Sequence, residues 1–164
     1  MLEINERIYF GSKKPNSMTE LSFSFKAPIS QNILFKLITD FENLPSYMPV
    51  QLKKVEIIEK NNAYTITEET FLLKTIFKKE IKQKSSHEII SSNEMQTKIT
   101  NGPAKGTLVQ ITLKEEEGET RINIKTSLKL GFKYKIFIPI VKKYYSPIFT
   151  GILYKMINST MNDV

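Results

Sequence analysis

Hydrophobic and polar residues alternate along several short segments of the chain, with the period of two that is typical of strands with one buried face. The clearest case is residues 21–26 (LSFSFK), where Leu21, Phe23 and Phe25 share a face. Residues 120–130 repeat the alternation, with aliphatic side chains on one face and mostly basic or polar ones on the other. The pattern therefore predicts an antiparallel sheet with one covered face and one face in water.

More strands are predicted between these two segments, because turn signals divide the intervening sequence. Residues 61–62 (NN) are a two-residue hairpin signal, residues 101–106 (NGPAKG) a turn, and residues 115–119 (EEEGE) a hairpin loop. Residues 85–93 are interpreted as a connection rather than a strand. The predicted strands after the first are residues 50–60, 63–73, 75–84, 95–100, 107–114 and 120–130.

Helical spacing of apolar residues predicts helices on both sides of this series of strands. Pro28 ends the first strand and Ser30 suits a helix N-cap, so we expect a helix after it and a second short helix over residues 41–48. Near the C-terminus we expect an irregular or helical lead-in and then a long main helix from about Ser146. This helix is the only predicted element large enough to cover the sheet, through an apolar stripe of Ile148, Phe149, Ile152, Leu153, Met156 and Ile157.

Length and composition favour one domain with a substantial core: the chain has 164 residues, of which 40% are hydrophobic. Residues 11–17 (GSKKPNS) are typical of a linker, so the chain divides into an N-terminal extension and linker, 1–17, and a domain, 18–164. The absence of Cys excludes disulfides and thiol catalysis. No signal peptide pattern and no membrane span is found, so the expected location is the cytoplasm, with peripheral contact to a membrane.

The net charge of +7 is concentrated at the C-terminal end. Residues 121–164 hold eight basic side chains and one acidic one, whereas the two signs balance in residues 1–120. Within this part, Lys133, Lys135, Lys142 and Lys143 alternate with aromatic and aliphatic residues. The segment could be core with a solvated fringe, a contact to an anionic membrane, or a nucleic-acid site. Bulky aliphatic residues suit lipid better than base stacking, so nucleic acid is the less favoured partner.

Several segments resemble the START-like superfamily, which includes Bet v 1-type proteins, polyketide cyclase/dehydrase-type proteins and lipid-transfer domains. They are residues 25–30 (FKAPIS), 38–49 (ITDFENLPSYMP), 101–103 (NGP) and 118–121 (GETR), followed by the long terminal helix. The resemblance extends over about residues 18–162, and within it residues 44–49 (LPSYMP) also resemble the coenzyme Q-binding branch.

This resemblance implies the helix-grip fold of the α+β class. In that fold a curved antiparallel sheet, here of about six to seven strands, wraps around a long C-terminal helix, with two short helices after the first strand and an apolar cavity inside. The implied function is non-catalytic binding or transport of a hydrophobic ligand: a lipid, a quinone or a polyketide-like molecule. Apolar residues expected to line the cavity are Ile66, Phe71, Phe77, Ile81, Ile99, Val109, Ile111, Leu113, Leu128, Phe149, Ile152, Leu153 and Met156.

Two other functions remain open. One is a cyclase or dehydratase that acts on a polyketide-like substrate, for which Tyr64, Glu68 or Glu69 would supply the titratable group. Glu68 and Glu69 are adjacent in a predicted strand and so point to opposite faces, although a rim position with both in water is favoured. The other is a module that binds RNA or the ribosome, as a toxin-like branch of the superfamily does.

Little else in the sequence indicates catalysis. His87 is the only histidine and is expected at the surface or at a strand end. A Ser/His/acid triad has no supporting G-x-S-x-G motif, and metal sites usually need several converging His, Cys or carboxylate ligands. We therefore predict no catalytic residue, no metal site and no cofactor.

Overall fold

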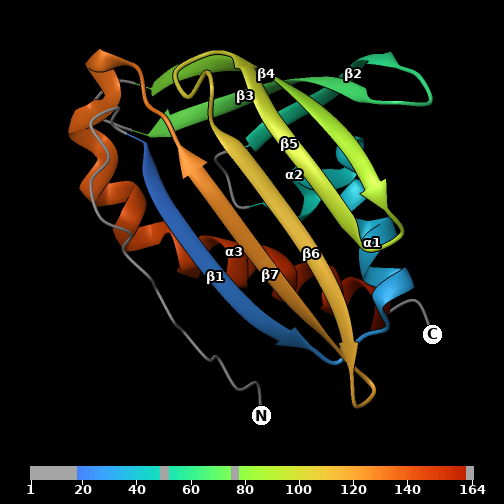
Figure 1. The fold of residues 1–164 in the computed structure, drawn as a ribbon. Helices are drawn as coiled ribbons and strands as arrows, with labels where there is room; N and C mark the ends of the chain where they lie inside the picture. The colour runs from blue at the N-terminus through green and yellow to red at the C-terminus, as the bar shows by residue number, and fades with distance from the viewer. Residues whose placement is uncertain (1–17, 49–51, 75–77, 162–164) are drawn as a thin grey trace.

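The computed structural model describes residues 18–48, 52–74 and 78–161, so the predicted extension and linker, 1–17, lies outside the described residues. Within these ranges a seven-stranded antiparallel sheet has the order β1-β7-β6-β5-β4-β3-β2. Figure 1 shows the sheet curving around a long C-terminal helix. The predicted helix-grip fold is confirmed. The strands are β1 (Thr19–Ala27), β2 (Leu52–Lys60), β3 (Thr65–Lys74), β4 (Lys78–Ser91), β5 (Glu94–Asn101), β6 (Leu108–Glu116) and β7 (Glu119–Leu128).

Helical segments occupy two places in the chain. The two short helices predicted after the first strand are present as α1 and α2, with a single 3-10 turn, η1, between them. At the C-terminal end, α3 lies behind β1, β7 and β6 and reaches α1 (Figure 1). The segments are α1 (Gln31–Thr39), η1 (Phe41–Asn43), α2 (Leu44–Tyr47), η2 (Phe132–Phe137) and α3 (Ile138–Met161).

The interpretation of residues 85–93 as a connection was wrong, because β4 continues unbroken to Ser91. This half of β4 is paired on both sides: Ser85 lies opposite Thr67 of β3, and His87 opposite Thr97 of β5. The Ser85 and His87 side chains point inward and are hydrogen-bonded. Tertiary pairing of this kind overrides the weak strand propensity of serine.

Of the two expected forms of the lead-in to the last helix, the structure has the helical one, because η2 is followed directly by α3, which begins at Ile138 and continues through Ser146. Pro139 lies in the first turn, where a missing N–H removes no helical hydrogen bond. Pro147 lies inside the helix, a position that kinks a helix, and Figure 1 shows α3 changing direction along its length. Among the described residues, no helix is both long and apolar enough to cross a membrane.

The main core lies between the inner face of β1, β6 and β7 and the helices α1 and α3. β1 is paired with β7 along its whole length, from Thr19 opposite Leu128 to Ala27 opposite Thr120. Where β1 leads into α1, the buried Thr120 hydroxyl donates a hydrogen bond to the Ile29 carbonyl, at 2.6 Å. The most deeply buried large side chains are Phe25, Leu34, Leu113, Ile122, Ile124 and Met156.

Candidate ligand-binding cavity

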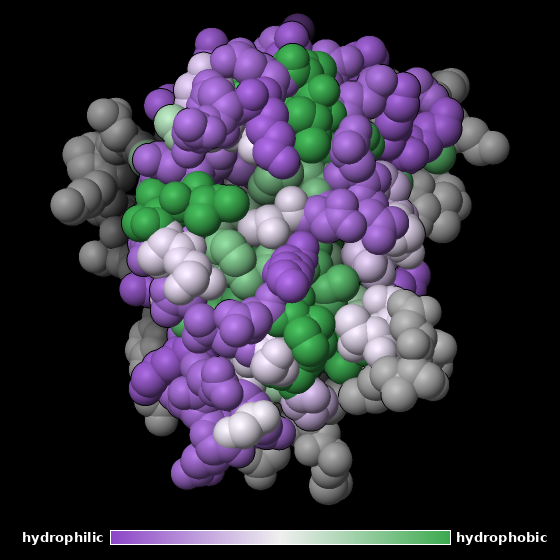
Figure 2. Space-filling model, turned by 90° about the vertical axis from the view of Figure 1, so that its right-hand side faces the viewer, coloured by the Kyte–Doolittle hydropathy of each residue, from purple (hydrophilic) through white to green (hydrophobic). Residues whose placement is uncertain are grey.

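A cavity of about 300 Å³ lies between the sheet and the helices. Helices α1 and α3, the η1–α2 segment and strands β2 to β7 all contribute residues to its wall. Most of these side chains are aliphatic, aromatic or methionine. Figure 2 shows the end of the molecule where α1 and the β2–β3 hairpin lie, with hydrophobic patches in the middle of a largely hydrophilic surface.

Eight of the apolar residues expected at the cavity are on its wall. They come from β3, β5, β6 and α3, the elements whose inner faces the alternation and the helical stripe identified. They are Phe71, Ile99, Val109, Ile111, Phe149, Ile152, Leu153 and Met156. Ile148 also lines the cavity although 40% of it is exposed, so it lies at the rim.

The other expected residues lie elsewhere. Ile66 alternates with the inward-facing Thr65 and Thr67 and so lies on the opposite face of β3. Leu113 and Leu128 are buried away from the cavity wall, and Ile81 lies near Gly131 and Tyr134. Phe77 lies outside the described residues.

Polar residues form one part of the wall, where β3, β4 and β5 pair. Glu69 of β3 is only 8% exposed, and both of its carboxylate oxygens accept hydrogen bonds. Oε1 accepts from the Thr67 hydroxyl at 2.6 Å, and Oε2 accepts from the Ser85 hydroxyl at 2.9 Å and from the Gln83 amide at 3.0 Å. These residues, with His87 and Thr97 described next, are called the polar cluster below.

His87 of β4 extends the cluster, and its expected surface position was wrong because the side chain is 7% exposed. Its Nε2 lies 2.9 Å from the Thr67 hydroxyl and its Nδ1 2.9 Å from the Thr97 hydroxyl. The ring also stacks on Phe41, with 4.0 Å between ring centroids. Because Thr67 donates its proton to Glu69, it accepts from His87, which places a hydrogen on Nε2. Both nitrogens and one face of the ring are therefore occupied.

Glu68 and Glu69 face opposite sides of the sheet, as expected for adjacent strand positions. The favoured alternative, in which both side chains reach water, was wrong. Glu68 faces outward and pairs with Lys82 at 2.8 Å. Burial raises the pKa of Glu69, but the His87 ring and the donors on Thr67, Ser85 and Gln83 outweigh burial and hold this pKa below its usual value. Glu69 is thus a buried carboxylate that remains ionised at neutral pH.

Sequence reasoning missed Thr67, Gln83, Ser85, His87 and Thr97. A signal for most of them was present, because polar residues occupy alternate positions 65, 67 and 69 on one strand and 83, 85 and 87 on the next. Finding the cluster required the register of β3 with β4, which places Glu69 opposite Gln83 and Thr67 opposite Ser85. Among the described residues, no group of three or more His, Asp or Glu side chains is arranged to hold a metal ion.

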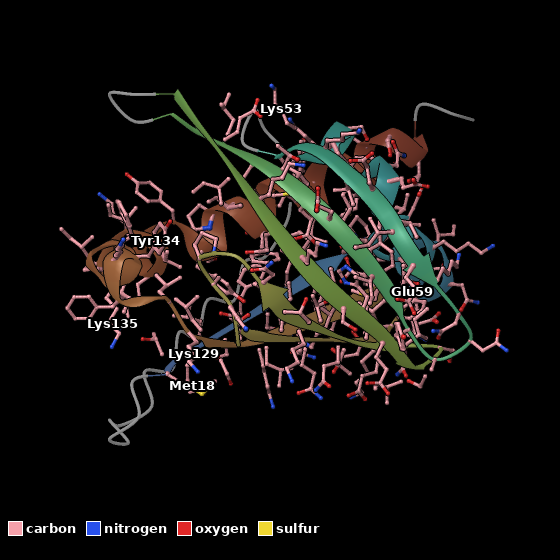
Figure 3. All side chains as sticks on the ribbon, turned by 90° about the horizontal axis from the view of Figure 1, so that it is seen from above. Met18, Lys53, Glu59, Lys129, Tyr134 and Lys135 are labelled. Carbon is pink, nitrogen blue, oxygen red and sulfur yellow. The ribbon has the colours of Figure 1, made fainter. Side chains whose placement is uncertain are left out.

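The four lysines proposed for membrane contact lie on η2 and the first half of α3. Phe132 beside them is 90% exposed and Ile136 is 77% exposed. Figure 3 shows Tyr134 and Lys135 projecting at this end of the molecule, far from Glu59 at the end of β2. The set of Phe132, Lys133, Lys135, Ile136, Ile140, Lys142, Lys143 and Tyr144 is called the basic apolar segment below.

Solved structures with the same architecture share little sequence with this chain. The protein TTHA0849 from Thermus thermophilus has a TM-score of 0.70 at 14% identity, covering 85% of this chain and 98% of its own. A START superfamily protein from Mycobacterium smegmatis has 0.71 at 12%, covering 90% and 100%. The di-domain ARO/CYC StfQ from the steffimycin biosynthetic pathway has 0.72 at 7%, covering 88% of this chain and 52% of its own. Identities this low show the fold alone.

A search of curated proteins found no significant match. Residues 27–160, by contrast, match the family described as polyketide cyclase / dehydrase and lipid transport. This match includes every strand from β2 to β7 and almost all of α3. The chain therefore belongs to the polyketide cyclase/dehydrase and lipid transport family.

Proposed function

We propose that the protein binds a hydrophobic ligand in the cavity between the sheet and α3. The observation that carries this proposal is the cavity itself, which has a volume of about 300 Å³ and a wall made largely of apolar side chains. Ligand pockets of proteins are typically of this kind, with few polar groups to fix orientation. Burial of ligand surface would contribute roughly 25 cal/mol per Å² of apolar area. Lipids, quinones and polyketide-like molecules all fit this class.

Two experiments test ligand binding. Organic extraction of the purified protein followed by mass spectrometry should recover an apolar molecule. Titration with the neutral fluorescent dye Nile red should show binding that Val109→Phe weakens roughly tenfold or more, because the larger ring occupies the cavity. Ile90→Phe is the matched control, because Ile90 is 50% exposed and lies outside the cavity wall. Dye binding that Val109→Phe and Ile90→Phe leave equally unchanged would contradict the proposal.

The cyclase or dehydratase alternative has less support from the polar cluster. A general acid or base must reach the proton that it transfers, but both nitrogens of His87 already contact threonine hydroxyls. Both carboxylate oxygens of Glu69 are likewise hydrogen-bonded inside the cluster. Tyr64 is bonded to Glu59 at 2.6 Å and does not line the cavity. The arrangement favours recognition of a polar group over acid–base chemistry.

We further propose that the basic apolar segment docks on an anionic bilayer when ligand is exchanged. Charge complementarity supports this choice: the segment carries four lysines, and no acidic residue occurs from position 121 to position 161. Phe132 and Ile136 are exposed enough to enter the headgroup region. Each lysine near an anionic surface would add about 1 kcal/mol. Because the rim residue Ile148 follows on the same helix, docking would bring the cavity near the lipid.

Liposome flotation tests the docking. The protein should float with anionic vesicles at low salt, less at high salt, and not with neutral vesicles. Replacing Lys133, Lys135, Lys142 and Lys143 by Glu should abolish flotation. The matched control reverses the same number of exposed lysines elsewhere: Lys36, Lys60, Lys98 and Lys125. Equal loss in both variants would reduce the effect to net charge, and salt-dependent RNA binding without vesicle binding would support the nucleic-acid alternative instead.

A further inference from the structure

The described part of the cavity wall carries one carboxylate, that of Glu69, and neither lysine nor arginine. The ion pairs of outward-facing glutamates, such as Glu68 with Lys82, lie on the opposite side of the sheet. Glu69 is stabilised instead by hydrogen bonds from the neutral side chains of Thr67, Gln83 and Ser85, and the His87 Nε2 atom lies 3.8 Å from its Oε1. The interior of the cavity is therefore electrostatically different from the basic exterior.

Hydrogen-bonding roles inside the polar cluster determine what it can offer to a ligand. Ser85 has a single hydroxyl proton, and this proton is donated to Glu69 at 2.9 Å. Ser85 lines the cavity, and its oxygen is left with acceptor capacity only. Gln83 uses one N–H on Glu69 and retains its carbonyl oxygen as an acceptor. The cluster thus presents acceptors beside a negative charge, which suits a group that donates a hydrogen bond.

We propose that the polar cluster selects apolar ligands whose polar head donates a hydrogen bond and is not anionic, and that Glu69 excludes a carboxylate head on the same hydrocarbon chain. This inference rests on the proposed ligand binding and deepens it. A second carboxylate placed near Glu69 would be repelled by it in a poorly screened interior. A hydroxyl or ammonium group would instead find acceptors in place. Glu69 is the specificity-determining residue.

Ligands of equal chain length and different charge test this selection. Nile red bound to the protein is displaced at pH 8, below micellar concentrations, with 1-decanol, decylammonium or decanoate. Decylammonium and decanoate both prefer water, so an uncharged cavity would reject them about equally. The net charge of +7 would favour decanoate at the exterior. A decylammonium preference of roughly tenfold or more would therefore report the cavity charge.

Two variants assign that preference to a residue. Glu69→Gln removes the charge at nearly constant shape and should bring decanoate to within a few-fold of decylammonium. Glu68→Gln is the matched control, because it removes the same unit of charge from the next residue on the opposite face. The Glu68→Gln protein should keep the wild-type ratio. Circular dichroism checks that both variants fold. If Glu69→Gln does not fold, the ratio of decylammonium to decanoate affinity in the wild-type protein still tests the selection.

The outcomes separate this inference from the proposed function. Equal displacement by decylammonium and decanoate in the wild type overturns the selection while ligand binding stands. A decylammonium preference that Glu69→Gln leaves unchanged, or that Glu68→Gln reduces equally, removes Glu69 from the explanation and also overturns the proposal. If Nile red does not bind the wild-type protein, the proposed function falls and the selection with it.

Discussion

Thr67 connects Glu69 with His87 on the cavity wall, and its replacement by valine should be strongly destabilising. The side chain is 0% exposed, so no bulk water can replace the lost hydroxyl. The substitution keeps the shape but leaves Glu69 Oε1 without its 2.6 Å donor and His87 Nε2 without its 2.9 Å acceptor. A buried polar group that loses its partner costs about 1–3 kcal/mol, so the two together should cost roughly 2–6 kcal/mol.

Direct contact between Glu69 and His87 would recover only part of this loss. His87 Nε2 and Glu69 Oε1 are 3.8 Å apart, so they would have to approach by about 1 Å to form a hydrogen bond. Thr67→Ser is the matched control, because it keeps the hydroxyl and removes one methyl group at about 1 kcal/mol. Urea unfolding followed by circular dichroism measures both variants. A loss in Thr67→Val no larger than that in Thr67→Ser would refute the reasoning.

The pH dependence provides a second signature of the same network. The pKa of Glu69 is lower in the folded protein than its ordinary value, so Glu69 stabilises the fold above the unfolded-state pKa of about 4.3 and less as the pH falls through the folded-state value. Without the Thr67 hydroxyl the pKa of Glu69 should be lowered less. The stability difference between the wild type and Thr67→Val should be largest near pH 7 and should shrink below about pH 4. A difference that is constant with pH would contradict this account.

Three further predictions concern packing, backbone conformation and ionisation. Leu113→Ala, at a fully buried position, should lower the free energy of unfolding by about 2–5 kcal/mol in urea. Gly102→Ala should destabilise the protein more than Gly118→Ala. Both glycines have positive φ, but a Cβ at Gly102 would lie 3.0 Å from a carbonyl oxygen, whereas a Cβ at Gly118 would meet nothing within 4 Å. Equal unfolding midpoints of the two variants would contradict this. Burial raises the pKa of Tyr145 to about 12 although it is bonded to Thr126, so spectrophotometric titration should lose its late phenol step in Tyr145→Phe.

The fold could be predicted from the sequence because its elements are amphipathic over several residues. Period-two alternation in β1 and β7 identified their buried faces, and the apolar stripe of α3 identified the covering helix. The errors came where long-range contacts decide local structure. β4 continues through Ser85 and His87 because β3 and β5 supply partners on both sides. The lead-in to the last helix was left open between irregular and helical, because a proline inside a helix usually signals a boundary, and α3 does extend before Pro147.

The cavity was predictable in its apolar part and not in its polar part. Residues such as Ile111 and Met156 are hydrophobic on an inward face, and this pattern is visible in the sequence. The lone histidine gives no such signal, because its environment is made by Thr67 and Thr97 from neighbouring strands and by Phe41 from η1. Strand register brings Thr67 and Thr97 to the histidine, and the packing of η1 against the sheet brings Phe41.

The pairing of β1 with β7 has a consequence during synthesis of the chain. Thr19 lies opposite Leu128, 109 residues later, and Ala27 lies opposite Thr120, 93 residues later. At a translation rate of roughly 5–20 residues per second, β1 therefore exists for roughly 5–20 s before its partner strand has been made. Throughout this interval the edge of β1 lacks its partner strand, and the hydrophobic face that carries Phe23 and Phe25 also lacks α3, which covers it in the folded protein and is made after β7. The nascent chain should depend on chaperones until β7 has been made, although the β2–β3 hairpin can form much earlier.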